Sequence, residues 1–285
     1  MPGDRIHQES ERLLQAVSRF LMDSPCAIAP EDVRALGVDE EEGYRLMLAA
    51  FLGLNLDDRA DAALYHACFP QMVRRLDPSG FEADPYLREV GFRAGSEGSF
   101  TLGTDSCSPM ELFVRDDMIR LEDGHVIPRL GWFARKHDFP ALRESGRIWM
   151  TVTPNEVNTI RPLAEASRGR VLCLGLGLGY YAFHALRNPE VTGVTVVERD
   201  AGLIRLFDRL LRPFFPKEKP LTIVRGDAFD AVRRLDPGAF DTVFTDLWHD
   251  VGDGLPMYLR MKELEQPGPR WLYWIEPTLK LYMDD

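Results

Sequence analysis

The chain has 285 residues, of which 45% are hydrophobic, so it can bury a sizeable core and is long enough for two domains. Its 45 acidic and 34 basic residues leave a formal net charge of −11. This charge argues against a nucleic-acid partner, because a negative protein repels a phosphate backbone. The four cysteines lie far apart and form no CxxC pair, which argues against a structural zinc site, any other metal centre and a disulfide framework.

The N-terminal residues predict neither export nor membrane insertion. Residues 1–5 lead directly into a charged amphipathic helix, without the apolar segment of a signal peptide. No uninterrupted apolar stretch approaches the ~20 residues that a membrane span needs. We therefore expect a cytoplasmic protein that does not insert into a membrane.

The first third of the chain has helical periodicity. Apolar residues recur at helical spacing over residues 13–21, until Asp23-Ser24-Pro25 ends the run. Further helices are predicted over residues 39–54 and 57–76, and Asp77-Pro78 ends the second of these. The apolar side chains of these helices are expected to form a core.

The composition then changes to Gly, Ser, Thr and β-forming residues over 91–131. Residues 111–114 and 118–121 are strand candidates, and 122–124 is a hairpin-type turn followed by 125–127. The sequence therefore predicts a small antiparallel β unit here.

From residue 147 onward strands and helices alternate. Residues 148–152 resemble a strand, and Thr153, Pro154 and Glu156 have the pattern of a capping box with proline at the first helical position. The strands that follow are predicted over 171–175, 192–198, 221–225, 240–246 and 271–275. This alternation predicts an α/β fold with a doubly wound, mostly parallel sheet. We expect an accessory region over 1–150 and a Rossmann-like domain over 151–285.

The most informative segment is the glycine loop, Gly175-Leu176-Gly177-Leu178-Gly179. It follows the apolar run 171–174 and precedes a helical pattern that begins at Tyr180. A strand, a glycine turn and a helix N-terminus together bring backbone N–H groups close to a nucleotide-like ligand. The third glycine comes one residue earlier than in the dinucleotide pattern G-x-G-x-x-G, so the loop favours a nucleoside cofactor other than NAD.

Polar residues also stand at the ends of the following predicted strands. Glu198 lies about 20 residues beyond the glycines, where an acid can accept hydrogen bonds from both ribose hydroxyls. Asp227 follows the third strand, and Asp246 and His249 follow the fourth. In an open α/β sheet, ligands bind beyond the carboxyl ends of the strands, so these side chains are candidate ligand contacts.

Each of these residues also has a purely structural interpretation. Glu198 could begin the next helix, Asp227 could cap the helix 228–235, and Asp246 could cap a loop or pair with a basic residue. His249 could be a solvated loop residue, and Trp248 could cover a ligand or only pack. The regular placement of polar residues at successive strand ends favours the functional interpretation.

These residues resemble the class I S-adenosylmethionine-dependent methyltransferase superfamily over residues 151–285. The resemblance implies that the glycine loop approaches the amino-acid end of S-adenosylmethionine and that Glu198 binds its ribose. It also implies that Asp227 and Ala228 contact the adenine, and that Asp246 lies near the methionine portion and the acceptor. The cofactor-binding residues implied in this way are Gly175, Gly177, Gly179, Glu198, Asp227, Ala228 and Asp246.

The chain departs from that superfamily at two places. Cys173 stands where the superfamily often has an acid two residues before the first glycine. No sixth and seventh strand is evident after the fifth, so residues 277–283 supply one short strand, or the N-terminal region or a second subunit covers the sheet edge. The aromatic residues Trp271, Tyr273 and Trp274 favour a covered or dimeric edge, so a homodimer is one of the expected arrangements.

Residues 226–229 and the fourth-strand segment also resemble the polyamine aminopropyltransferase branch of the superfamily. That branch uses an acid within its glycine loop to hold the aminopropyl amine, whereas this chain has Leu176 and Leu178 in the loop. The Asn-Pro-Pro-Tyr segment of amino-group methyltransferases is absent, because Asp246-Leu247-Trp248-His249 occupies its place.

From these observations the leading hypothesis is a transferase that moves a methyl group from S-adenosylmethionine to a small-molecule or peptide acceptor. Asp246 or His249 would act as the base, and residues 1–150 would form a lid and acceptor wall. Two alternatives remain open. One is aminopropyl transfer from the decarboxylated cofactor by a spermidine synthase-like enzyme, and the other is a non-catalytic nucleoside-binding module.

Overall fold

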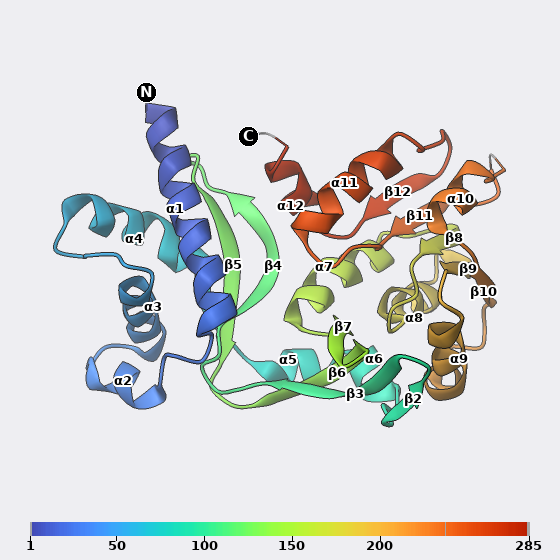
Figure 1. Ribbon diagram of the computed structural model, residues 1–285, viewed down its shortest axis with the longest axis horizontal. Helices are drawn as coiled ribbons and strands as arrows, with labels where there is room; N and C mark the ends of the chain where they lie inside the picture. Colours follow the sequence, from blue (N-terminus) through green and yellow to red (C-terminus); the bar gives the residue numbers. More distant parts are fainter. Residues whose placement is uncertain (1, 237, 284–285) are drawn as a thin grey trace. The chain divides into compact units, whose positions relative to one another are not determined.

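The computed structural model describes residues 2–236 and 238–283 (Figure 1). It contains two compact units that are interleaved in sequence. The first comprises residues 1–81, 106–138 and 280–285, and the second comprises residues 82–105 and 139–279. This division differs from the predicted boundary at residue 150, because residues 82–105 and 139–150 belong to the same unit as the α/β sheet.

The first unit packs helices against a three-stranded sheet. The helices are α1 (Pro2–Asp23), α2 (Pro30–Ala35), α3 (Glu40–Phe51), α4 (Arg59–Met72) and the short α5 (Pro78–Glu82). The strand order is β1 (Val73–Leu76), β5 (Val126–Phe133) and β4 (Phe113–Arg120). Strand β1 pairs with β5 in parallel, and β4 pairs with β5 antiparallel.

The core of this unit lies between its helices and β5. Tyr44 of α3 stacks on Trp132 of β5 with ring centroids 4.7 Å apart, and both side chains are fully buried. Leu13 and Val17 of α1 and Phe69 of α4 join the same buried cluster. The helical periodicity of residues 13–21 and 39–54 therefore marks core positions, as predicted.

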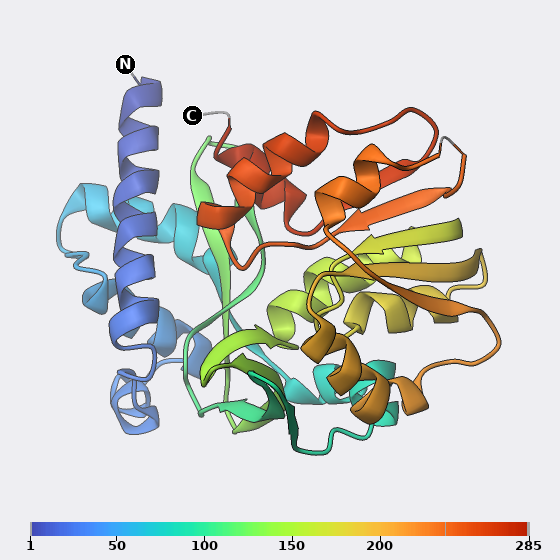
Figure 2. The same cartoon turned by 45° about the vertical axis from the view of Figure 1, so that its right-hand side comes forward.

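The second unit contains a parallel sheet in the order β10-β9-β8-β11-β12, whose strands lie side by side in Figure 2. The strands are β8 (Gly169–Leu174), β9 (Val191–Glu198), β10 (Leu221–Arg225), β11 (Thr242–Thr245) and β12 (Arg270–Tyr273). All four neighbouring pairs are parallel. The chain moves outward in one direction from β8 to β10 and then returns to the other side of β8, so the order reverses between β8 and β11.

Helices alternate with these strands. They are α7 (Pro154–Glu165), α8 (Tyr180–Arg187), α9 (Ala201–Leu210), the 3₁₀ turn η1 (Arg212–Phe214), α10 (Ala228–Arg233), α11 (Val251–Lys262) and α12 (Glu276–Leu281). The capping box predicted at the start of α7 is present, with Glu156 accepting a hydrogen bond from the Thr153 N–H at 2.8 Å. The predicted α/β fold class is confirmed.

The second unit also holds α6 (Pro85–Glu89) and a four-stranded sheet. Its strands are β2 (Gly95–Glu97), β3 (Phe100–Cys107), β6 (His137–Glu144) and β7 (Arg147–Thr151). The β2–β3 and β6–β7 pairs are antiparallel. The predicted small β unit is therefore divided between two sheets, because the hairpin β4–β5 pairs with β1 in the first unit.

Two secondary-structure predictions were wrong. The helix expected over 57–76 ends at Met72, and Val73–Leu76 forms strand β1 because it pairs in parallel with Leu130–Phe133. The short strand considered for 277–283 does not form, because Glu276–Leu281 is the helix α12.

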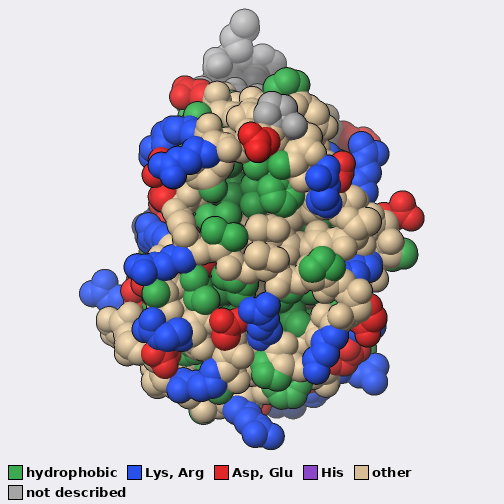
Figure 3. Space-filling view, turned by 90° about the vertical axis from the view of Figure 1, so that its right-hand side faces the viewer, with side chains coloured by type: hydrophobic (Ala, Val, Ile, Leu, Met, Phe, Trp, Pro, Cys, Tyr) green, Lys and Arg blue, Asp and Glu red, His purple; other side chains and the backbone are tan. Residues whose placement is uncertain are grey.

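None of the described helices combines the length and hydropathy needed to cross a membrane. In the space-filling view of Figure 3, basic and acidic side chains are interspersed around small hydrophobic patches. An interspersed surface of this kind does not generate a single-sign field on that face.

Candidate functional site

A cavity of about 220 Å³ lies in the second unit at the carboxyl ends of its parallel strands. This is the edge where β8 and β11 meet and the strand order reverses, which is the usual ligand site of an open α/β sheet. The cavity is lined by predicted site residues from four strand ends. They are Gly175, Gly177, Glu198, Asp227, Ala228, Asp246 and His249.

The glycine loop turns sharply because its three glycines have positive φ angles of +98°, +49° and +78°. A Cβ on Gly175 would overlap the carbonyl oxygen of Asp246, and one on Gly177 would overlap the thioether of Met150. Gly179 is the N-cap of α8, and a Cβ there would come within 2.8 Å of Phe207 and Phe215. The first two glycines therefore line the cavity, whereas Gly179 packs the helix against its neighbours and lies outside the lining.

Most N–H groups of the glycine loop are already used within the protein. The Leu176 N–H donates to Glu198 Oε2 at 3.1 Å, and the Leu178 N–H donates to Met150 Sδ at 3.2 Å. The N–H groups of Gly175 and Gly179 donate to backbone carbonyls. Within the described chain, the Gly177 N–H alone in this loop is left for a ligand.

Glu198 is the last residue of β9 and is about nine-tenths buried. Its second carboxylate oxygen accepts the Asp200 N–H at 2.8 Å. Helix α9 is capped by Asp200 and not by Glu198, so the interpretation of Glu198 as a helix-starting residue is wrong. Each oxygen retains acceptor capacity, because a carboxylate oxygen has two lone pairs.

Asp227 combines its two predicted roles. Its side chain caps α10 by accepting the Asp230 N–H at 3.0 Å, and it also lines the cavity beside Ala228. The capping bond leaves one carboxylate oxygen available to a ligand.

Asp246 and Glu156 are two acids that share a second, smaller cavity of about 20 Å³. Burial, together with the nearby negative charge of Glu156, raises the pKa of Asp246 to about 8. Burial also raises the pKa of Glu156, although hydrogen bonds from Thr153 oppose the shift. Burial, followed by the charges of Asp246 and Glu198, raises the pKa of the Cys173 thiol. Each of these acidic groups is therefore disfavoured in its charged form, chiefly by burial.

His249 faces the cavity but has an exposed side chain, with 47% of its surface accessible. Its Nδ1 lies 3.0 Å from Asp253 Oδ2, and its ring contacts Trp149 edge to face with centroids 4.5 Å apart. Burial tends to raise the pKa of Asp253, but hydrogen bonds from the His249 ring and from the His249 and Asp250 N–H groups lower it overall. The Asp253 carboxylate thereby orients the imidazole of His249.

Trp248 lines the cavity and is 4% exposed. Its indole Nε1 is buried and makes no hydrogen bond to any described residue. A buried N–H donor without a partner is costly, so this atom is a candidate for a ligand contact.

Sequence reasoning missed the part of the wall that comes from outside the parallel sheet. Phe100 of β3, Glu144 of β6, and Trp149 and Met150 of β7 all line the cavity. The sequence offered only a weak indication that these residues line a site, because their strands precede the α/β repeat and carry no motif. Trp149 and Met150 stand in the strand candidate directly before the capping box and could have been suspected on that ground.

A buried aspartate was missed as well. Asp84 accepts hydrogen bonds from Tyr180 Oη at 2.9 Å and caps α6 through the Tyr86 N–H, and His184 Nε2 lies 3.2 Å from it. Tyr180 and His184 belong to α8, the helix that follows the glycine loop. These hydrogen bonds therefore link α6 to α8.

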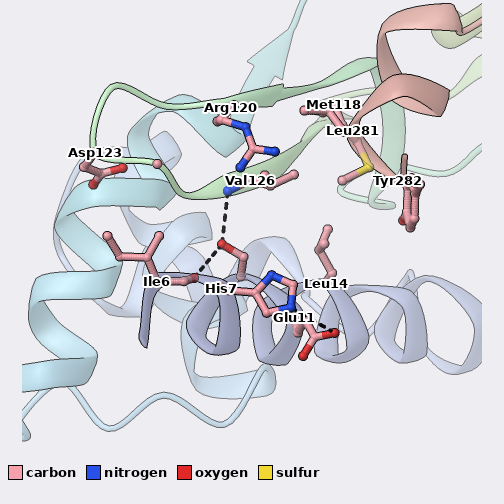
Figure 4. A pocket seen from close by; sticks show the side chains of 12 residues that line it. Ile6, His7, Glu11, Leu14, Met118, Arg120, Asp123, Val126, Leu281 and Tyr282 are labelled. Atoms are coloured by element: carbon pink, nitrogen blue, oxygen red, sulfur yellow. Dashed lines mark hydrogen bonds and ion pairs between the residues drawn. The ribbon is translucent and has the colours of Figure 1, made fainter. Parts of the chain in front are cut away.

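The first unit has another cavity, of about 280 Å³, between α1 and the β4–β5 hairpin (Figure 4). Several of its polar groups bind one another: Ser10 Oγ donates to the Ile6 carbonyl and accepts the Val126 N–H, and His7 lies 3.7 Å from Glu11. Its wall is otherwise largely apolar and contains no strand-end motif. The cavity at the strand ends is therefore the better candidate site.

The fold and site define an α/β protein with a cavity at the carboxyl ends of its parallel strands. No known family profile matches the chain. It is 33% identical over 93 residues to Polyamine aminopropyltransferase 2 of Streptomyces coelicolor (strain ATCC BAA-471 / A3(2) / M145). The match covers 31% of this chain and 17% of that protein. The chain thus resembles the polyamine aminopropyltransferase branch of the class I S-adenosylmethionine-dependent superfamily.

Two solved structures give weak overall similarity. A probable spermidine synthase from Corynebacterium glutamicum ATCC 13032 is 18% identical with a TM-score of 0.34, over 47% of this chain and 55% of that one. Spermidine synthase from Thermotoga maritima is 15% identical with a TM-score of 0.38, over 66% of this chain and 60% of that one. The chain therefore spans less than two thirds of the length of each of these relatives.

The close packing of the glycine loop can be tested directly by measuring the free energy of unfolding. Gly175→Ala combines a strained positive φ with overlap on the Asp246 carbonyl, so it should lower the free energy of unfolding by about 3 kcal/mol. Gly226→Ala is the control, because a Cβ there meets nothing closer than Val197 at 3.8 Å and should change stability by less than about 0.5 kcal/mol. Urea denaturation measures both values. Equal effects of the two substitutions would show that the loop tolerates a side chain.

Proposed function

We propose that this protein is an aminopropyltransferase-like enzyme that transfers an alkyl group from a sulfonium nucleoside, decarboxylated S-adenosylmethionine, to an amine. The observation that carries the proposal is the shared cavity of Glu198, Asp227 and Asp246 with the glycine loop. The similarity to a polyamine aminopropyltransferase favours this reaction over methyl transfer. Methyl transfer from S-adenosylmethionine, the leading hypothesis from sequence, becomes the second candidate.

The residues of the cavity fit such a donor. Glu198 has free lone pairs for two ribose hydroxyls, and Asp227 has a free oxygen for the adenine amino group. The Asp246 carboxyl accepts no hydrogen bond from any described residue, so its charged form lacks a partner until a cation binds. Met150 packs against Gly177 in the loop, and its flexible side chain must rotate to give a nucleoside full access.

The reaction requires mostly positioning, because the sulfonium already makes its neighbouring carbon reactive. The amine lone pair forms a new C–N bond at the propyl carbon as the C–S bond breaks. The bonding pair passes to sulfur, which leaves as the neutral thioether 5′-methylthioadenosine, and the nitrogen loses a proton. Asp246 in its ionised form, or His249 oriented by Asp253, would accept that proton.

A ligand panel tests the function itself. Decarboxylated S-adenosylmethionine and 5′-methylthioadenosine should each raise the melting temperature more than S-adenosylmethionine or S-adenosylhomocysteine, and NAD should have no effect. Incubation with the decarboxylated donor and linear diamines or polyamines should release 5′-methylthioadenosine. Preference for S-adenosylmethionine and S-adenosylhomocysteine would favour methyl transfer. Binding without turnover would favour a nucleoside-binding module, and no shift with any compound would overturn the site.

The proposed contact between Glu198 and the ribose can be tested with two substitutions at opposite ends of β9. Glu198→Ala should weaken 5′-methylthioadenosine binding by roughly 1.5–3 kcal/mol, because hydrogen bonds to a charged acceptor are lost. Glu190→Ala is the matched control, because this exposed glutamate directly precedes the opposite end of β9. Isothermal titration calorimetry measures both affinities. An unchanged affinity in Glu198→Ala would limit Glu198 to its contacts with Leu176 and Asp200.

Donor binding should also depend on pH through Asp246. The pKa of Asp246 is about 8 in the folded protein and lies above its value in the unfolded chain. The uncharged form of Asp246 therefore prevails below pH 8. The contribution of this side chain to folding stability is lost as the pH rises through 8. A cation favours the carboxylate, so affinity for the sulfonium donor should rise by up to about tenfold per pH unit between pH 6 and 8 and then level off. The other titratable or charged groups that face these cavities are Glu144, Glu156, Cys173, Tyr180, Tyr181, Glu198, Arg199, Asp200, Asp227, His249 and Asp253.

The controls separate Asp246 from its neighbours. Asp246→Asn should flatten the pH dependence, and affinity for the neutral 5′-methylthioadenosine should stay nearly constant with pH in the unmodified protein. Histidine also changes charge near neutral pH, so His249→Gln serves as a further control that should retain the dependence. Loss of the dependence in His249→Gln, with its retention in Asp246→Asn, would assign it to the histidine.

A further inference from the structure

The glycine loop carries leucines at both of its variable positions, so it supplies no acid to hold the amine of an aminopropyl donor. Leu176 is nevertheless part of the wall of both cavities, together with Gly175, Met150 and Asp246. The smaller cavity therefore adjoins the loop at Leu176, one of its two variable positions. Among the described residues, the one further carboxyl group that lines it belongs to Glu156.

We propose that Glu156, together with Asp246, binds the primary ammonium group of the sulfonium donor and so supplies the negative charge that the glycine loop lacks. This inference rests on the proposed function and assigns Glu156 as a substrate-binding residue. The geometry behind it is the shared lining of the small cavity by the two carboxyl groups.

The position of Glu156 is fixed before any ligand binds. It is the third residue of α7, and its Oε2 accepts the Thr153 N–H at 2.8 Å and also bonds the Thr153 hydroxyl. Its Oε1 accepts the Thr151 hydroxyl at 3.4 Å. All these donors are neutral, so they orient the carboxylate and leave its charge uncompensated. A capping box thus doubles as a rigid support for a binding group.

The wall of the small cavity holds no competing cation among the described residues. No Lys, Arg or His lines the small cavity among the described residues, whose remaining polar members are Thr151, Cys173, Tyr180 and Tyr181. Two acids confined without a basic partner repel one another and raise the free energy of the charged state. A bound ammonium group relieves both costs at once.

The Met150 side chain lines both cavities and lies beside the glycine loop. Its thioether accepts the Leu178 N–H and lies over Gly177, and the side chain lines both cavities. Rotation of this unbranched side chain would join the small cavity to the larger one. The propylamine arm of the donor would then reach Glu156 while its nucleoside stays at Glu198.

The test variant is Glu156→Gln, which removes the charge and keeps a residue that is compatible with the capping box. Glu165→Gln is the matched control, because it removes one charge from an exposed position on the same helix. Three probes are titrated by calorimetry: decarboxylated S-adenosylmethionine, its analogue with propyl in place of aminopropyl, and 5′-methylthioadenosine. Glu156→Gln should weaken the first at least tenfold and the other two less than twofold, whereas Glu165→Gln should change none.

Equal weakening of all three probes by Glu156→Gln would overturn the inference, because it would mark a structural role only. No change in any affinity would overturn it as well. If Glu156→Gln fails to unfold cooperatively, the unmodified protein still tests the inference. Equal affinity of the unmodified protein for the propyl analogue and for decarboxylated S-adenosylmethionine would exclude recognition of the ammonium group. Failure of the unmodified protein to bind any of the three probes would instead overturn the proposed function itself.

Discussion

The close packing of Gly175 against the backbone carbonyl of Asp246 is the contact on which the site depends. It joins the ends of β8 and β11, the two neighbouring strands between which the sheet order reverses. No side chain fits between them, and the positive φ of Gly175 turns the loop toward the cavity. Because the loop direction is fixed here, Glu198 on the adjacent strand can accept the Leu176 N–H and hold the turn from the other side. The site is therefore a consequence of backbone geometry before any ligand contributes.

The sequence was sufficient to predict the parallel sheet, because a buried parallel strand is a short apolar run with a local signature. All five strands were found within a few residues, and so was the capping box at Thr153. The strand-end acids followed from the same logic, since the carboxyl ends of parallel strands lie on one edge. Glu198, Asp227 and Asp246 do meet at one cavity.

What the sequence did not predict depends on long-range pairing. Val73–Leu76 continues an apparently helical segment, and only its parallel pairing with β5 makes it a strand. Trp149 and Met150 reach the cavity because β7 pairs with β6, which no local pattern reveals. Glu156 was recognised as a cap, but the repulsion it exerts on Asp246 depends on the fold bringing both side chains to one small cavity. Local patterns thus identify the elements, whereas the second wall of the cavity arises from pairings between distant segments.

The charge of the cavity bears on the choice between donors. S-adenosylmethionine carries a carboxylate on the carbon that bears its amino group, and decarboxylation removes that negative charge while it leaves the ammonium and the sulfonium. In their ionised forms, Asp246 and Glu198 in the wall of the larger cavity, and Glu156 in the wall of the smaller one, would repel a carboxylate and favour both cationic centres. In a partly buried setting such repulsion is weakly screened, so a single carboxylate has a large effect on affinity. Under the proposed function, these acids would therefore favour a donor with two positive charges and no negative one.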